Sequence, residues 1–146
     1  MFDTFEPTER SSGVFLAPRA TLLAELASRA RKIAGRAVTT VDLTGPAPRS
    51  SHPLSPSLTA LVNDAGEPAR TENLAIRRET GATCVWVFPA STPAWTVGAL
   101  IVLGEVERDA HRQLTSLATE LALRLDAQDR ENNREVLARL TARRVA

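Results

Sequence analysis

Side chains that could carry out covalent or metal chemistry are few, and they are far apart in the sequence. The one cysteine, Cys84, lies in the apolar run "TCVWVF", which is more typical of a small buried hydrophobe than of a nucleophile. The two histidines, His52 and His111, lack the spacing of a metal-binding pair, and Lys32 is the single candidate for Schiff-base chemistry. The chain contains neither a G-x-S-x-G elbow nor a G-x-x-x-x-G-K loop. We therefore expect no enzyme activity, no metal site and no cofactor.

Noncovalent recognition has better support, because three aromatic residues fall on one apolar stretch. These are Trp86, Phe88 and Trp95. A tryptophan offers flat apolar surface and one N–H donor to a planar ligand, although core packing is the more usual role of such residues. Four charged residues could orient a ligand, although turns and solvated surfaces favour them too: Asp42, Arg70, Arg77 and Arg78. The sequence leaves both interpretations open.

Composition indicates one globular domain. At 146 residues and 15.8 kDa, with 43% apolar and 24% charged residues, the chain can form a single core. A net charge of +1 argues against a surface built around a nucleic-acid backbone, which usually needs a basic excess. Residues 1–17 lack the features of a signal peptide, and we expect a partly disordered lead-in. A single cysteine favours the reducing cytoplasm.

The most apolar stretch, Thr83–Glu105, predicts the centre of a sheet. Two prolines divide it into runs at residues 83–89 and 95–103, and each is shorter than the roughly 20 apolar residues that span a bilayer. We therefore expect two antiparallel strands and no membrane segment. Both faces of this strand pair are apolar, so each face must be covered by another element. Alternation places three side chains on one face of the first strand: Cys84, Trp86 and Phe88.

Helices before and after these strands can cover one face of the sheet. Residues 17–37, "APRATLLAELASRARKIAGRA", carry apolar side chains at steps of three and four, and Gly35 is a natural stop for that helix. The β-branched run Val38–Val41 predicts a short strand. Residues 46–56, "PAPRSSHPLSP", predict a loop rich in proline and serine.

A short helix can cover the other face. Ser55 followed by proline indicates a helix start, and the apolar pattern predicts a helix that ends near Gly66. Residues 67–75 predict a peripheral strand, and residues 76–82 predict a polar connection. The short helix and the preceding loop could form the wall of a ligand pocket or an ordinary cover for the core.

Residues 105–144 contain neither proline nor glycine and predict one long helix. Leucines in its first half can pack on the sheet, whereas residues 126–135 are almost entirely polar and bury little alone. A heptad-spaced seam runs through Ala118, Leu125 and Asn132. An asparagine in such a seam can set the register of a parallel helix pair, and the alternative is that Asn132 faces water.

The order of these elements resembles that of a small GAF-type sensor domain. In this resemblance "GEPARTENLA" looks like the peripheral strand before the pocket loop, and "CVWVFPASTPAWTVGALIVLG" is similar to the paired central strands. The segment "LTSLATELALRL" looks like the exit helix. "RKIAGRAVTTVDLTG" and "LALRLDAQDRENNREVLARL" are also similar to the sensor portion of PucR-like (purine catabolism regulator) transcription factors, in which the exit helix leads to a DNA-binding domain.

The resemblance implies an α+β fold, with a GAF-like antiparallel sheet, helices on both faces and a long C-terminal helix. It implies a sensor domain at residues 18–125 and a helical extension for signalling and dimerisation at residues 126–146. A loop, "PAPRSSHP", replaces the second strand that such domains usually have after "DLTG".

Two functions fit this sequence. The first is a ligand-sensing, homodimeric regulatory domain that binds a small metabolite and acts in transcription through its exit helix, reaching DNA only through a domain outside this chain. The alternative is a ligand-free dimerisation or adaptor module of the same fold. The predicted pocket residues are Cys84, Trp86, Phe88, Trp95, Val41 and Leu61. The predicted dimerisation residues are Leu22, Leu26, Leu114, Ala118, Leu121, Leu125 and Asn132.

Overall fold

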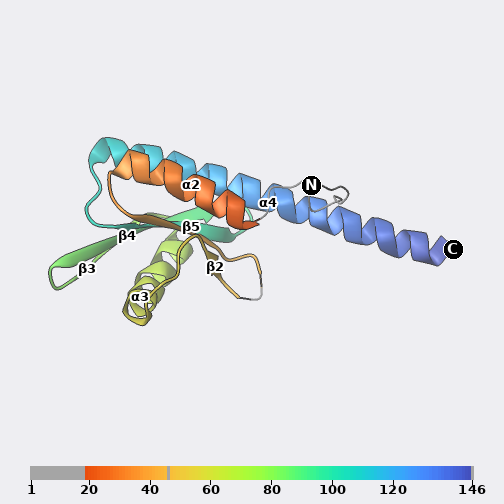
Figure 1. Cartoon of the computed structure of the whole chain (residues 1–146), viewed down its shortest axis with the longest axis horizontal. Coiled ribbons are helices and arrows are strands. Elements are labelled where there is room, and N and C mark those ends of the chain that lie inside the picture. The colour runs from red at the N-terminus through yellow and green to blue at the C-terminus, as the bar shows by residue number, and fades with distance from the viewer. Residues whose placement is uncertain (1–18, 46, 146) are drawn as a thin grey trace, which may run out of the picture.

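The computed structural model describes residues 19–45 and 47–145, so the predicted lead-in at residues 1–17 lies outside the described residues. Figure 1 shows one open sheet with helices on both of its faces and a last helix that runs far past it. The elements in chain order are α2 (Arg19–Ala34), β1 (Val38–Asp42), β2 (Arg49–Ser50), α3 (Pro56–Glu72), β3 (Ile76–Thr80), β4 (Thr83–Ser91), β5 (Thr96–Leu103) and α4 (Arg108–Val145). Among the described helices, none has the length and apolar character needed to cross a membrane.

The sheet is antiparallel throughout, with the strand order β2-β1-β5-β4-β3. The predicted central pair is confirmed, since β4 and β5 lie side by side with Val87 opposite Ile101. Their alternating side chains enter two separate apolar clusters, one on each face of the sheet. These observations confirm the predicted α+β architecture with both faces covered.

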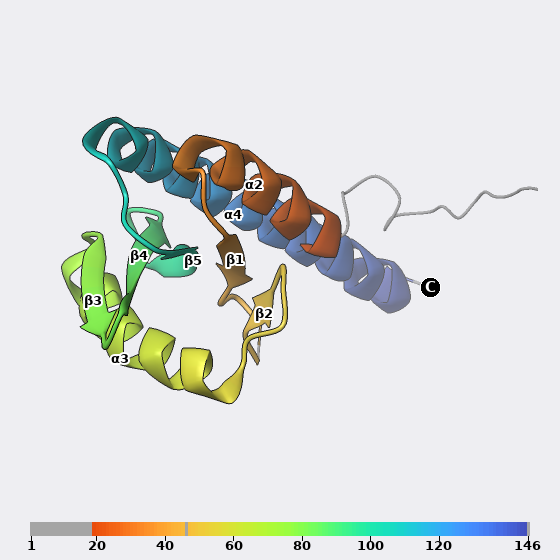
Figure 2. The ribbon, with the colours of Figure 1, turned by 60° about the vertical axis from the view of Figure 1, so that its left-hand side comes forward.

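Helices α2 and α4 cover one face together, and Figure 2 shows them running side by side over it. The interior of this layer is made of large leucines that are fully buried, among them Leu22, Leu26 and Leu121. Outside the core, charges join the two helices: Arg29 donates to Glu120 at 2.6 Å and Arg124 donates to Glu25 at 2.9 Å. The hydrogen bonds from these arginines lower the pKa of each glutamate carboxyl.

Helix α3 covers the opposite face, and it is longer than the sequence predicts. It begins as expected, with the Ser55 side chain accepting a hydrogen bond from the Leu58 backbone N–H at 3.1 Å. It then continues through Pro68 to Glu72, so the peripheral strand predicted at residues 67–75 is wrong. The small side chains of Ala65 and Ala69, on either side of Pro68 in the helix, are fully buried against the sheet, and this packing outweighs the cost of a proline inside the helix.

The edge strand β3 forms where the sequence predicts a polar connection. Its residues pair with β4, with Ile76 opposite Val87 and Arg77 opposite Trp86. The sequence "IRRET" does not alternate between apolar and polar residues, so it did not indicate a strand. The strand lies at the edge of the sheet and carries charged side chains, as exposed edges often do. The loop at residues 46–56 also differs from the prediction, because it contributes the two-residue strand β2.

The predicted dimerisation residues are buried within the chain itself. Six of the seven have at most 1% of their surface exposed and belong to the core between the sheet, α2 and α4. These six are Leu22, Leu26, Leu114, Ala118, Leu121 and Leu125. A second copy cannot contact their side chains while the core is closed, so the prediction that they form a dimer interface is wrong. Asn132 alone is exposed. Core packing and helix pairing use the same apolar spacing, and the pattern does not distinguish them.

Gly98 on β5 allows the sheet and α4 to approach closely. A Cβ at this position would lie 2.4 Å from the backbone oxygen of Val41 on β1 and 3.1 Å from Leu125 Cδ1 on α4. Neither neighbour has room to withdraw, since one is backbone within the sheet and the other is a fully buried side chain.

We therefore predict that Gly98→Ala destabilises the protein by roughly 2–3 kcal/mol, because the methyl group overpacks the junction of β1, β5 and α4. Urea denaturation measures the change. Gly66→Ala is the matched control: no atom lies within 4 Å of its Cβ position, and alanine should leave stability unchanged or raise it by up to about 1 kcal/mol. Equal stability of the two variants would contradict this account of Gly98.

Candidate functional site

A cavity of about 230 Å³ lies between the sheet and one side of α3. Its floor is apolar and comes from three neighbouring strands, with Val41 from β1, Val87 from β4, and Ala99 and Ile101 from β5. Its remaining walls come mostly from α3, and we call the whole the sheet–α3 pocket. The further lining residues are Leu43, Val62, Asn63, Gly66, Glu67 and Arg70.

Small residues on α3 explain why the pocket is there. Ala65 and Ala69 are fully buried and hold the helix against the sheet along one stripe. Gly66 lies beside this stripe, and no atom stands within 4 Å of the place where its Cβ would be. Because Gly66 lines this space and no atom stands near its Cβ position, a larger side chain there has room to extend into the pocket.

The rim of the pocket is polar. Glu67 and Arg70 form an ion pair at 3.8 Å along the exposed side of α3, and Asn63 offers an amide one turn earlier. An apolar floor bordered by a few hydrogen-bonding groups is the usual composition of a small-molecule site. This arrangement can hold the apolar body of a ligand and orient its polar edge, without any group placed for covalent chemistry.

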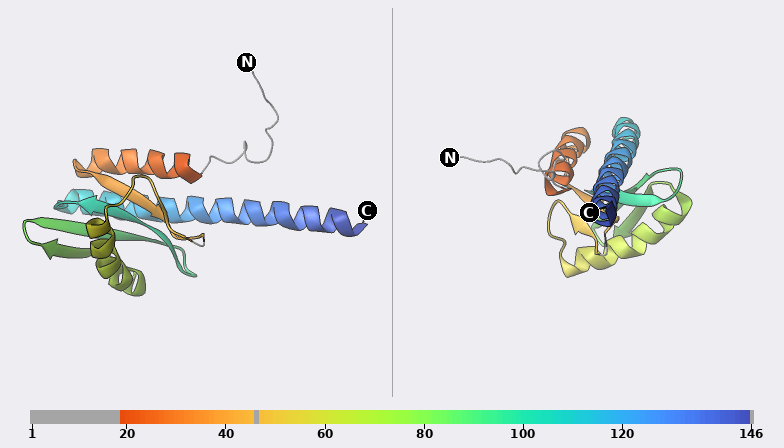
Figure 3. Two further views of the ribbon diagram at one scale, coloured as in Figure 1. Left: turned by 60° about the horizontal axis from the view of Figure 1, so that its bottom comes forward. Right: turned by 90° about the vertical axis from the view of Figure 1, so that its right-hand side faces the viewer.

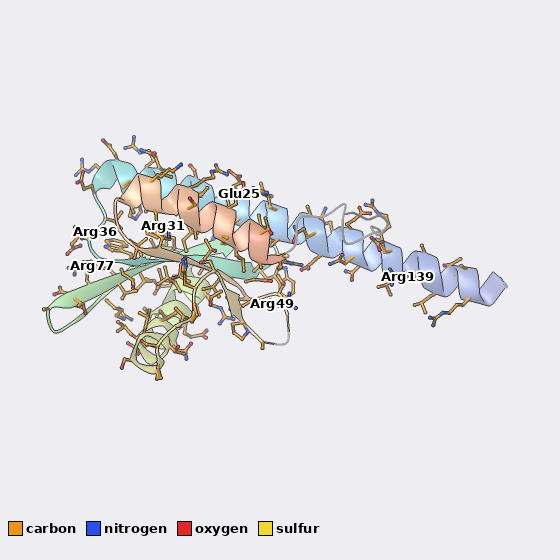
Figure 4. All side chains as sticks on the ribbon, in the orientation of Figure 1. Glu25, Arg31, Arg36, Arg49, Arg77 and Arg139 are labelled. Atoms are coloured by element: carbon orange, nitrogen blue, oxygen red, sulfur yellow. The ribbon has the colours of Figure 1, made fainter. Side chains whose placement is uncertain are left out.

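A larger cavity of about 620 Å³ lies on the other side of α3, and we call it the edge cavity. Leu58 and Leu61 of α3 contribute apolar wall, whereas Arg36 and Arg77 bring charge at one end of the sheet, as Figure 4 shows. Two carboxylates already neutralise Arg77, since it donates to Glu105 at 3.0 Å and to Glu79 at 2.7 Å.

The charges at the edge cavity stabilise one another. Hydrogen bonds to Glu105 and then Glu79 raise the pKa of Arg77, and the bond from Arg77 lowers the pKa of the Glu105 carboxyl. Four apolar side chains from three strands form the floor of the sheet–α3 pocket, whereas the wall of the edge cavity includes the ion-paired side chains of Arg77, Glu79 and Glu105. We therefore take the sheet–α3 pocket as the candidate site.

The structure does not bring the six predicted pocket residues together. Val41 lines the sheet–α3 pocket, whereas Leu61 and Cys84 line the edge cavity. Trp86 and Phe88 belong to the opposite face of the sheet. Trp95 lies outside both cavities, just before β5, with 61% of its surface exposed.

Trp86 and Phe88 form an aromatic cluster under α4. Their rings stack with centroids 5.8 Å apart, and His111 of α4 packs edge-on against both, at 5.4 and 5.1 Å. The predicted alternation is correct for Trp86 and Phe88, which share a face, but that face is covered by α4 and not by α3. The floor residues Val87 and Ile101 have the opposite parity, and the sequence shows their alternation as clearly.

No metal site is visible in the described part of the chain, because no three His, Cys, Asp or Glu side chains there are grouped to hold an ion. His111 packs in the aromatic cluster, and the Ser51 hydroxyl lies 3.0 Å from the His52 ring nitrogen Nδ1. Neither histidine meets the other or Cys84 in these contacts.

Comparison with solved structures identifies the fold. Similar structures include the GAF domain of a candidate sensor histidine kinase from Pseudomonas syringae pv. tomato, with a TM-score of 0.60 and 20% identity over 90% of this chain and 86% of that chain. The GAF domain/HD domain protein from Geobacter sulfurreducens matches with a TM-score of 0.58 and 13% identity over 75% and 93%. The GAF-B domain of DevS from Mycobacterium smegmatis gives 0.57 and 16% over 78% and 97%.

No protein-family model matches the sequence, and no curated protein matches it significantly. The structural similarity at 13–20% identity therefore establishes the fold alone, and that fold is the GAF fold. This confirms the fold expected from the sequence resemblance.

Trp86 should matter for stability. We predict that Trp86→Ala destabilises the protein by roughly 2–4 kcal/mol, because it removes a ring packed on Phe88 and His111. Urea denaturation measures the loss. Trp95→Ala is the control, since that side chain is mostly exposed, and its effect should stay within about 0.5 kcal/mol. A Trp86 variant as stable as the Trp95 variant would show that the aromatic cluster contributes nothing.

Proposed function

We propose that this protein is a ligand-sensing regulatory domain, in which a small molecule binds in the sheet–α3 pocket. The observation that supports this most directly is the open space beside Gly66 above an apolar floor built from three strands. The GAF fold agrees with the proposal, because the similar structures include the GAF domain of a candidate sensor kinase.

The pocket lining indicates the chemistry of the ligand. At about 230 Å³ the space is smaller than the roughly 300–1,000 Å³ typical of drug-sized ligands, so we expect a small metabolite. One face of the ligand should be apolar, to lie on Val41, Val87 and Ile101. Its edge should carry a hydrogen-bonding group that can reach Asn63 or the Glu67–Arg70 pair.

We further propose that two copies pair through an exposed stripe of α4. Leu137 and Leu140 are 63% and 46% exposed, and Asn133 continues the same spacing of four and three residues toward the domain. Leu123, which is 59% exposed, lies two heptads before Leu137. This stripe can form a helix pair with Asn133 as the polar position that sets its register.

Other aspects of the function rest on the sequence resemblance. We propose that the domain belongs to a PucR-like transcription regulator, that it acts in the cytoplasm without catalysing a reaction, and that it reaches DNA only through another domain. A ligand-free dimerisation module is the second candidate, and the exposed leucines of α4 favour it as much as they favour a sensor.

Ligand binding can be tested with a thermal-shift screen of small metabolites on three forms of the chain. A binder should raise the melting temperature of the wild type and of Gly66→Ala, since one methyl group leaves most of the pocket free. At 100 times its Kd the ligand would stabilise the folded state by about 2.7 kcal/mol. Gly66→Leu should abolish the shift, because its side chain fills the space.

An equal shift in Gly66→Leu would place the binding site elsewhere. Melting temperatures that no metabolite changes in the wild type would favour the ligand-free module.

Pairing through α4 can be tested by sedimentation equilibrium. The double variant Leu137→Glu, Leu140→Glu should have a dimer dissociation constant at least tenfold higher than that of the wild type, because it places like charges in the apolar stripe. Its melting curve at high dilution should match that of the wild type, since both residues lie outside the core. Ala142→Glu is the control on the opposite side of the helix, and it should leave the dimer intact.

A further inference from the structure

One arginine at the start of α2 contacts two other elements of the fold. Arg19 Nη1 lies 3.5 Å from Asp42 Oδ2 at the end of β1, and Arg19 Nη2 forms a short ion pair with Asp129 of α4. The Arg19 side chain is only 13% exposed and that of Asp42 only 2%. Partly buried charge pairs of this kind are less screened by water than pairs on the open surface.

Asp42 is firmly held from its other side. Its Oδ1 accepts hydrogen bonds from the Thr44 backbone N–H at 2.9 Å and from the Thr44 hydroxyl at 2.6 Å. Its two sequence neighbours, Val41 and Leu43, both line the sheet–α3 pocket. The position of the Asp42 carboxylate therefore follows the position of the strand end that forms the pocket wall.

Asp129 lies where α4 leaves the domain. It follows Leu125, which is fully buried, by about one helical turn. Farther along, the ion pairs of the helix are local, as between Glu131 and Arg134 or between Glu135 and Arg139. Figure 3 shows this part of α4 running out beyond the sheet and α2.

We propose that Arg19 is a positioning residue that couples the sheet–α3 pocket to the outgoing part of α4. This inference rests on the proposed function, and it names the route by which an occupied pocket would be detected. A guanidinium is a rigid fork, and it bonds two carboxylates well only at a suitable separation. Arg19 Nη1 faces Asp42 and donates to the Thr44 hydroxyl at 3.4 Å, whereas Nη2 donates to Asp129. An occupant that displaces the end of β1 therefore shifts Asp42 and Thr44, draws the guanidinium with them and weakens its hydrogen bond to Asp129.

The consequence is a change in the outgoing helix. With Asp129 released, residues 126–135 lose an anchor to the domain and open more often. Because coupling is reciprocal, a variant that lacks the Asp129 contact should also lose the response to pocket filling. A cycle of variants at the pocket and at Asp129 measures this coupling directly.

The test uses hydrogen exchange in the full chain, and Gly66→Leu serves as a permanent occupant of the pocket. The four forms compared are the wild type, Gly66→Leu, Asp129→Asn and the double variant. Asp129→Asn alone should raise exchange across residues 126–135 roughly threefold to tenfold. Gly66→Leu should raise it similarly in the wild type and add little in the Asp129→Asn background.

Two controls isolate the contact. Glu131→Gln removes a local pair with Arg134 and should leave the response to Gly66→Leu intact. Gly66→Ala should produce no response, since it leaves the pocket largely free. Should Gly66→Leu fail to fold, Gly66→Met takes its place with a more flexible side chain.

An exchange response of equal size with and without Asp129 would overturn the proposal, and so would the absence of any response in the wild type. Both outcomes differ from failure of the sensor function, which is decided separately by whether a metabolite shifts the melting temperature. A ligand that binds while Asp129→Asn keeps the full response would leave the sensor standing and remove Arg19 from its mechanism.

Discussion

The double burial of β4 and β5 is the constraint on which the rest of the structure depends. These strands are apolar on both faces, and an antiparallel pair without a wet face is stable only when both sides are covered. The chain meets this requirement with α2 and α4 on one side and α3 on the other. Gly98 shows how tight the arrangement is, because a single methyl group there would meet β1 and α4 together.

The two faces of the sheet are covered in different ways: large side chains fill one face closely, whereas the helix over the other face leaves space beside it. Leucines of α2 and α4 fill the first side, and the ring cluster of Trp86, Phe88 and His111 extends it under the start of α4. On the second side, α3 touches the sheet through Ala65 and Ala69 and leaves cavities beside it. Two of the cavities lie beside α3, and a third, more open hollow lies along the start of α4. The apolar floor of the sheet–α3 pocket, built from three strands, indicates that the α3 side is the one that can accept a ligand.

Much of the architecture could be predicted from the sequence, because apolar periodicity is local information. The strand pair, α2, β1 and the long α4 follow from it directly. The extent of α3 could not be predicted, since Pro68 indicates a break and only packing against the sheet overrides it. The site was harder, because alternation tells which residues share a face but not which helix covers that face. Trp86 was therefore placed in the pocket, and Val87 was missed.

The apolar pattern of α4 was misread as one continuous seam, because the helix carries two apolar stripes on different sides. At about 100° per residue, Leu137 lies roughly 120° around the helix from Leu125, so the apolar stripe of the outgoing part does not continue the stripe of the core. The polar residues 126–135 lie between the last buried leucine, Leu125, and the exposed pair Leu137 and Leu140, and within them Asp129 makes its contact with Arg19. One face of α4 thus completes the core of the domain, and another face presents exposed leucines. The Arg19–Asp129 ion pair lies between the buried part of the helix and the part with exposed leucines. Breaking the Arg19–Asp129 ion pair would therefore change the part of α4 that presents the exposed leucines and leave its core-facing leucines in place.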